Sequence, residues 1–92
     1  MSLEYRVAFK ALHDVLINEW DPIDVNDSPE AQNEYDSYIP VIFRLVSEGK
    51  SDRDIADHLA MIESDWMGLT PQPDRNLRIA SRLREVVAWV KN

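Results

Sequence analysis

The sequence predicts an all-α protein, a compact four-helix bundle that forms a single domain over residues 1–92. Four stretches carry apolar residues three and four positions apart, which is the period of an amphipathic helix. The chain has only two glycines and few β-branched runs, whereas a sheet-rich fold needs more turns. Its length suits one domain, and its 45% of apolar residues is enough for one core.

The first predicted helix begins after Ser2 and ends before Asp21. The Ser2 hydroxyl can cap the start of the helix. Pro22 disfavours helical geometry in the residue before it, so the helix should end there. The apolar stripe of this helix comprises Tyr5, Ala8, Phe9, Leu12, Val15 and Leu16.

The second predicted helix runs from Pro29 to Gly49 and is kinked or broken near Pro40. Ser28 followed by Pro29 is typical of a helix start, and Gly49 is typical of a helix end. Because Pro40 lacks an N–H, we expect an interruption over residues 36–39, with Asp36 or Ser37 capping the second half. The apolar stripe comprises Ala31, Tyr35, Tyr38, Ile39, Ile42, Leu45 and Val46.

The second half of the chain predicts two more helices. Ser51 and Asp54 have capping-box spacing, and Gly68 should end the third helix. Its predicted buried stripe is Ile55, Leu59, Ile62 and Trp66. After a loop with two prolines, Asp74 is the predicted cap of the fourth helix. The core face of that helix comprises Leu77, Ile79, Ala80, Leu83, Val86, Val87 and Val90.

Composition narrows the possible functions. Without cysteine, disulfides, thiolate zinc sites and thiol catalysis are excluded. No apolar run approaches the roughly 20 residues that span a bilayer, and the N-terminal residues do not have the pattern of a signal peptide. A net charge of −7 disfavours nucleic acid and anionic membranes as partners. These features predict a cytoplasmic protein that does not bind a membrane.

The sequence predicts no catalytic residue, metal or cofactor, and hence no enzyme. His13 and His58 lack neighbours that would define a nucleophile or an orienting partner. From Asp24 onward the chain superficially resembles a calcium loop, but Pro29 stands at the glycine position and Tyr35 at the bidentate glutamate position.

The segment between Lys10 and Arg44 is the candidate recognition surface, because it holds eight carboxylates and no lysine or arginine. Its aromatic rings have the spacing of core residues, in which case the carboxylates would form an acidic rim around them. Trp89 joins the candidate surface because it departs from the apolar face of its helix and lies beside arginines. The predicted partner-binding residues are Trp20, Asp21, Asp24, Asp27, Glu30, Glu34, Tyr35, Asp36, Tyr38 and Trp89.

Two residues of the later helices leave alternatives open. Glu63 falls on an apolar face, where a lone carboxylate is costly. An arginine of the last helix should pair with it, and a partner's cation is the alternative. Trp89 could stack on arginines, mark a partner surface, or be covered by the N-terminal residues.

The blocks Glu19-Trp20-Asp21-Pro22 and Glu34-Tyr35-Asp36-Ser37-Tyr38, with the later Ile62-Glu63, resemble those of a group of small bacterial all-helical proteins of unknown function. The resemblance covers about residues 12–69 and implies a bacterial cytosolic protein with four helices. It implies no activity. By analogy with other small acidic helical proteins, a toxin-neutralising immunity-type protein is one alternative function.

The leading hypothesis is a non-enzymatic protein–protein interaction module whose acidic, aromatic segment meets a partner with a basic surface. A homo-oligomer would instead pair that segment with the basic last helix of a second copy through Trp89. A helix-turn-helix-like DNA-associated regulator is a further alternative, because residues 45–59 resemble the first part of that motif. It would need Arg75, Arg78 and Arg82 to form an exposed basic stripe, and the continuous helix after residue 59 disfavours it.

Overall fold

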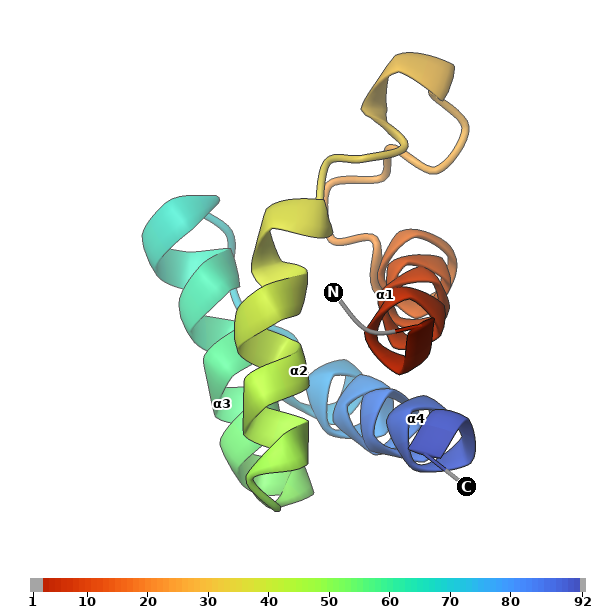
Figure 1. Ribbon diagram of the computed structural model, residues 1–92. Helices are drawn as coiled ribbons and strands as arrows, with labels where there is room; N and C mark the ends of the chain where they lie inside the picture. The colour runs from red at the N-terminus through yellow and green to blue at the C-terminus, as the bar shows by residue number, and fades with distance from the viewer. Residues whose placement is uncertain (1–2, 92) are drawn as a thin grey trace.

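The four predicted helices are present and pack as an all-α bundle in the computed structural model, which describes residues 3–91. The helices are α1 (Leu3–Val15), α2 (Ile39–Ser47), α3 (Asp52–Met61) and α4 (Pro73–Lys91). Helices α2 and α3 lie side by side, and α4 packs mainly on α1 and α3 (Figure 1). No strand occurs between residues 3 and 91, and no helix there is long and apolar enough to cross a membrane. The Ser2 cap lies outside the described residues.

Helices α1 and α3 each continue into one π-helical turn, η1 (Leu16–Trp20) and η4 (Ile62–Trp66). In each turn a backbone N–H reaches back five residues: Asp21 N donates to Leu16 O at 2.9 Å, and Met67 N donates to Ile62 O at 3.1 Å. Asp21 then adopts left-handed geometry (φ +35°), and Gly68 does so after η4 (φ +69°). The predicted ends of the first and third helices are therefore confirmed.

The core collects the apolar stripes of all four helices and the two aromatic residues that flank the acidic segment. Trp20 and Tyr35 are its largest fully buried side chains. The other buried hydrophobic residues are Ala8, Leu12, Val15, Leu16, Ile17, Ile39, Ile42, Ile55, Ala56, Leu59, Ile62, Ile79, Ala80, Leu83 and Val87. A core built around two large rings stabilises this short chain, since each ring buries a large apolar area.

The predicted break in the second helix is present, but the prediction that the first half is helical is wrong. Pro29 starts only a single 3₁₀ turn, η2 (Pro29–Ala31), and the Ser28 hydroxyl donates to Glu30 instead of capping. A second 3₁₀ turn, η3 (Asp36–Tyr38), leads into α2. Pro40 lies in the first turn of α2, where its missing N–H has no intrahelical partner to lose. Neither Asp36 nor Ser37 caps this helix: its cap position is Tyr38, without a side-chain hydrogen bond.

Helix α3 begins as predicted, but the prediction that Trp66 is buried is wrong. Ser51 Oγ accepts a hydrogen bond from Asp54 N at 3.1 Å, and Ser51 N donates to the Asp54 carboxylate at 3.4 Å, which completes the capping box. Trp66 is 63% exposed. The wider turn of η4 rotates this side chain away from the stripe that a regular helix would continue.

Helix α4 begins slightly earlier than predicted. Asn76 N donates to Gln72 O at 2.9 Å, so Asp74 lies inside the first turn and is not the cap. Leu77, predicted to face the core, is 40% exposed, and the buried residue of this turn is Asn76, which is 1% exposed. The middle of the predicted core face is confirmed, because Ile79, Ala80, Leu83 and Val87 are buried.

Candidate functional site: a protruding acidic loop

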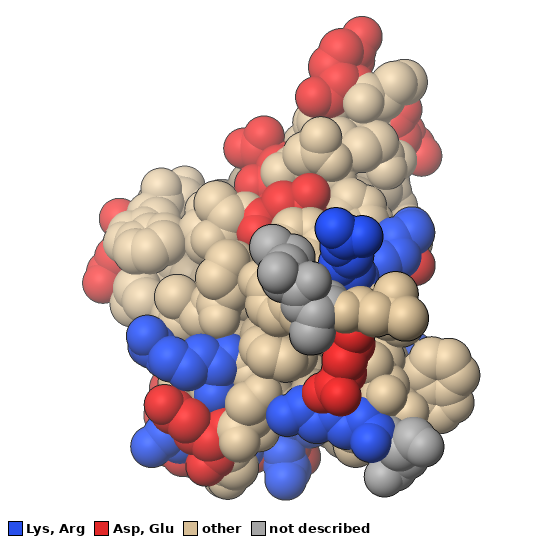
Figure 2. Space-filling model, in the orientation of Figure 1, with Lys and Arg blue, Asp and Glu red and all other residues tan. Residues whose placement is uncertain are grey.

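The residues between Asp21 and Tyr35, here called the acidic loop, project from the end of the bundle as a separate lobe (Figure 1). On the face shown in Figure 2, carboxylates lie at the tip of this lobe and the basic side chains lie lower, on the bundle. Within the loop, the Gln32 side-chain amide donates to Asn26 O at 2.8 Å and to Ser28 O at 3.1 Å. The loop is therefore held by its own hydrogen bonds and has a defined shape.

Trp20 anchors the N-terminal end of the acidic loop to the bundle. The η1 turn places its side chain in the core, where it is only 2% exposed. The indole Nε1 donates to Asn76 Oδ1 at 3.0 Å, and the ring packs against that of Tyr35 with a centroid separation of 5.3 Å. A buried indole N–H usually finds such a partner, because leaving it unpaired is costly.

Tyr35 and Asp21 close the base of the loop. Tyr35 Oη donates to Asp21 Oδ1 at 2.7 Å and accepts from Ile23 N at 3.3 Å. The same Asp21 carboxylate accepts from Val25 N at 2.8 Å and from Asn26 N at 3.1 Å. Burial raises the pKa of the Tyr35 hydroxyl well above its usual value, and the hydrogen bond to Asp21 raises it further. Asp21 therefore shapes the turn at the base of the loop.

Glu63 is linked to Trp20 through Asn76 in a buried polar network. Its carboxylate accepts from Arg75 Nη2 at 2.7 Å and from Asn76 Nδ2 at 2.5 Å. The predicted pair between Glu63 and an arginine of the last helix is therefore present. Because Asn76 also accepts from Trp20, one chain of hydrogen bonds links η4, α4 and η1. The network is not completely paired, because Arg75 Nε is buried without a hydrogen-bond partner, and this offsets part of the stabilisation.

Four predicted partner-binding carboxylates are exposed on the acidic loop: Asp24, Asp27, Glu30 and Glu34. Glu30 accepts a hydrogen bond from the Ser28 hydroxyl at 3.2 Å. Within residues 3–91 no lysine or arginine forms an ion pair with any of the four. Asp24 has left-handed backbone geometry (φ +57°), which aspartate tolerates better than most residues. These four side chains give the loop its negative charge.

The remaining predicted residues divide between the base of the loop and a distant surface. The Asp36 carboxylate lies 2.6 Å from His13 Nδ1, which ties the returning chain to α1. Tyr38 packs against Trp66 at the end of η4, with ring centroids 5.5 Å apart. Trp89, 73% exposed, lies near the C-terminal end of α4, and Figure 1 shows that this end of the helix lies away from the loop. The structure thus places all the predicted residues except Trp89 on the loop or at its base, but Trp20 and Tyr35 are buried there and do not face a partner.

Sequence reasoning missed two residues of this site, Asn76 and Trp66. Asn76 lies three and four residues before Ile79 and Ala80, so a helical wheel of the last helix places it on the buried face. A second signal was the predicted burial of Glu63, which requires hydrogen-bond donors from another element. Trp66 carried no such signal, because a regular helical wheel cannot show a π turn.

The two histidines lie on different helices and have different surroundings. His13 on α1 contacts Asp36, whereas His58 on α3 is partly buried. Burial lowers the pKa of His58 below its usual value, and the nearby positive charge of Arg44 lowers it further. In the described part of the chain, no group of three or more histidine, aspartate or glutamate side chains is placed to hold a metal ion.

Comparison of the chain with protein-family models, with curated proteins and with solved structures gives no match. The functional interpretation therefore depends on the residues of the chain itself.

Proposed function

We propose that this protein is a non-enzymatic interaction module whose acidic loop binds a basic surface of a partner protein. The observation that carries the proposal is the set of four exposed loop carboxylates, Asp24, Asp27, Glu30 and Glu34, without an ion-pair partner among residues 3–91. Like charges gathered on a projecting lobe produce a field that attracts a cationic surface and raises the rate of encounter.

The construction of the loop supports this role. Trp20 and Tyr35 are buried in the core at its two ends, and the Asp21 carboxylate fixes the turn between them. A loop that is already ordered before it binds loses little conformational entropy on association, so more of the interaction free energy remains as affinity. The rigid base therefore suits a recognition surface.

The pairing of the basic residues of α4 also favours a protein partner over nucleic acid. Arg75 pairs with Glu63, Arg82 pairs with both Glu19 and Glu85, and Arg84 pairs with Asp52. Two of the three arginines in the stripe that DNA binding would require, Arg75 and Arg82, are thus neutralised by the protein's own carboxylates, whereas Arg78 is exposed and forms no ion pair among residues 3–91. A phosphate backbone would have to displace these pairs, which weakens the electrostatic attraction that such binding needs.

The proposal is tested by affinity capture from a bacterial lysate at low and high salt, with two variants of equal net charge. The first variant neutralises the loop by Asp24→Asn, Asp27→Asn, Glu30→Gln and Glu34→Gln. The second neutralises four exposed carboxylates elsewhere: Glu4→Gln, Glu48→Gln, Asp57→Asn and Asp74→Asn.

We expect a partner that binds the wild type and the second variant at low salt, and that is lost with the first variant and at high salt. A set of captured proteins that is the same for both variants would refute the proposal. Circular dichroism checks that both variants remain folded, which we expect because all eight positions are exposed.

A further inference from the structure

Trp66 is an exposed tryptophan that the fold holds in place. It is 63% exposed at the last residue of η4, where the π turn rotates it out of the core stripe. Its ring lies on that of Tyr38, with a centroid separation of 5.5 Å and an interplanar angle of 35°. Tyr38 directly follows the base of the acidic loop, three residues after the Tyr35 anchor. A large apolar surface is therefore kept in water next to the candidate recognition site.

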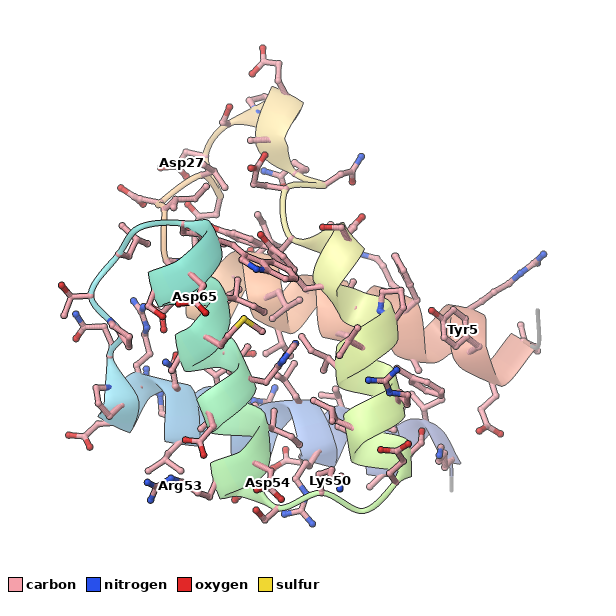
Figure 3. All side chains as sticks on the ribbon, turned by 90° about the vertical axis from the view of Figure 1, so that its left-hand side faces the viewer. Tyr5, Asp27, Lys50, Arg53, Asp54 and Asp65 are labelled. Atoms are coloured by element: carbon pink, nitrogen blue, oxygen red, sulfur yellow. The ribbon has the colours of Figure 1, made fainter. Side chains whose placement is uncertain are left out.

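The surroundings of this aromatic pair favour a cationic ligand. Asp65, the neighbour of Trp66 in sequence, is exposed. Figure 3 shows Asp65 at the end of the third helix, on the same side of the molecule as Asp27 of the acidic loop. The basic residues labelled there, Lys50 and Arg53, lie at the opposite end of that helix. Among the described residues no cation stacks on either ring of the pair, since the one such contact joins Lys91 and Phe43.

We propose that Trp66, supported by Tyr38, is the stacking platform for an arginine side chain of the basic partner segment that the acidic loop attracts. This inference rests on the proposed function and names the chemistry of the contact. A planar guanidinium stacks on an aromatic face while it keeps hydrogen bonds to carboxylates at its edge, so arginine suits an aromatic pair flanked by acidic residues better than lysine does. Tryptophan and arginine are also the residues most enriched at binding hot spots.

The chain offers a matched control for this contact, because Trp89 is a second exposed tryptophan remote from the acidic loop. Trp89 is 73% exposed, against 63% for Trp66. Removing either indole therefore deletes a similar exposed surface, but only Trp66 lies beside the loop. A general effect of exposed aromatic surface would be the same in both variants.

The test measures dissociation constants at low salt for a short synthetic peptide of alternating arginine and serine. Two further peptides carry lysine or the neutral analogue citrulline in place of arginine. We expect the arginine peptide to bind more tightly than the lysine peptide, and the citrulline peptide not to bind. Trp66→Ala should weaken the arginine peptide about three- to tenfold and remove its advantage over lysine. Trp66→Phe should retain part of the affinity, and Trp89→Ala should leave it unchanged.

Nuclear magnetic resonance provides a direct second readout, because each indole N–H gives its own signal. On addition of the arginine peptide, the Trp66 signal should shift and the Trp89 signal should not. The inference is overturned if Trp66→Ala binds the peptide like the wild type, if Trp89→Ala weakens it equally, or if the wild type does not bind it.

The loop variant distinguishes a failure of the stacking platform from a failure of the proposed function. If the four loop substitutions weaken the arginine peptide while Trp66→Ala does not, the stacking platform is wrong and the acidic loop stands. If the loop variant binds the peptide as tightly as the variant with four neutralised carboxylates elsewhere, the proposed function fails as well.

Discussion

The substitution Asn76→Ala tests whether the buried polar network holds the acidic loop to the bundle. Asn76 is 1% exposed and forms two hydrogen bonds, one from Trp20 Nε1 at 3.0 Å and one to the Glu63 carboxylate at 2.5 Å. Alanine leaves both partners without this bond in a space too buried for bulk water to replace it. Glu63 keeps only Arg75, and the indole N–H has no other partner among the described residues.

The expected loss follows from these two bonds. Each buried group left unpaired costs about 1–3 kcal/mol, and the higher helix propensity of alanine returns about 0.5 kcal/mol. The free energy of unfolding should therefore fall by about 2–5 kcal/mol, a large part of the roughly 5–15 kcal/mol typical of a folded domain. The measurement is urea denaturation followed by far-ultraviolet circular dichroism.

The control is Asn18→Ala, an exposed asparagine of η1 without a side-chain hydrogen bond to the described residues. It should change the free energy of unfolding by less than about 0.5 kcal/mol. Trp20→Phe removes the N–H donor of the same hydrogen bond. The double variant should therefore lose less free energy of unfolding than the sum of the losses in the two single variants. A loss below about 1 kcal/mol for Asn76→Ala, or full additivity with Trp20→Phe, would refute the network as an anchor.

Three further predictions concern titration and capping. Because the pKa of Tyr35 is raised in the folded protein, its contribution to stability is complete below the unfolded value of 10.0 and is lost as the pH rises above it. Tyr35→Phe should therefore flatten the fall in urea midpoint above that pH, and an unchanged slope would contradict this assignment. Because the pKa of His58 is lowered in the folded protein, its effect on stability has the opposite pH dependence, and stability is lost as the pH falls below the unfolded value of 6.5. A titration of the His58 ring by proton nuclear magnetic resonance with a midpoint at or above that value would contradict this prediction. Ser51→Ala breaks the capping box and should cost about 0.5–2 kcal/mol in urea denaturation, whereas Ser81→Ala, on an exposed face of α4, should cost almost nothing.

The fold class was predictable because the four helices carry regular apolar stripes and recognisable ends. Pro22, Gly49, Gly68 and the Ser51 capping box each act within a few residues, so the sequence alone marks them. The segment that failed, residues 28–35, had a helix start and apolar spacing but no long helix. Its Tyr35 is held by contacts with Trp20 and Asp21, and such tertiary contacts override a local preference.

The candidate site was predictable as an acidic segment but not in its detail. The sequence marked the carboxylates and the buried character of the rings, because both depend on residue type and spacing. It did not show that Asp21 serves the turn while Asp24 and Asp27 stay exposed, since that depends on backbone geometry at φ +35°. The rotation of Trp66 likewise comes from one extra residue in a turn, which periodicity averages away.

The rings of Trp20 and Tyr35, at the two ends of the acidic loop, lie only 5.3 Å apart. A chain segment whose ends are already joined can vary in length cheaply, because doubling it adds only about 0.6 kcal/mol of closure entropy. The bundle is therefore suited to loop grafting. A new hairpin inserted between Trp20 and Tyr35 would have its two ends held together by the same pair of rings, so one set of helices would present many different binding surfaces.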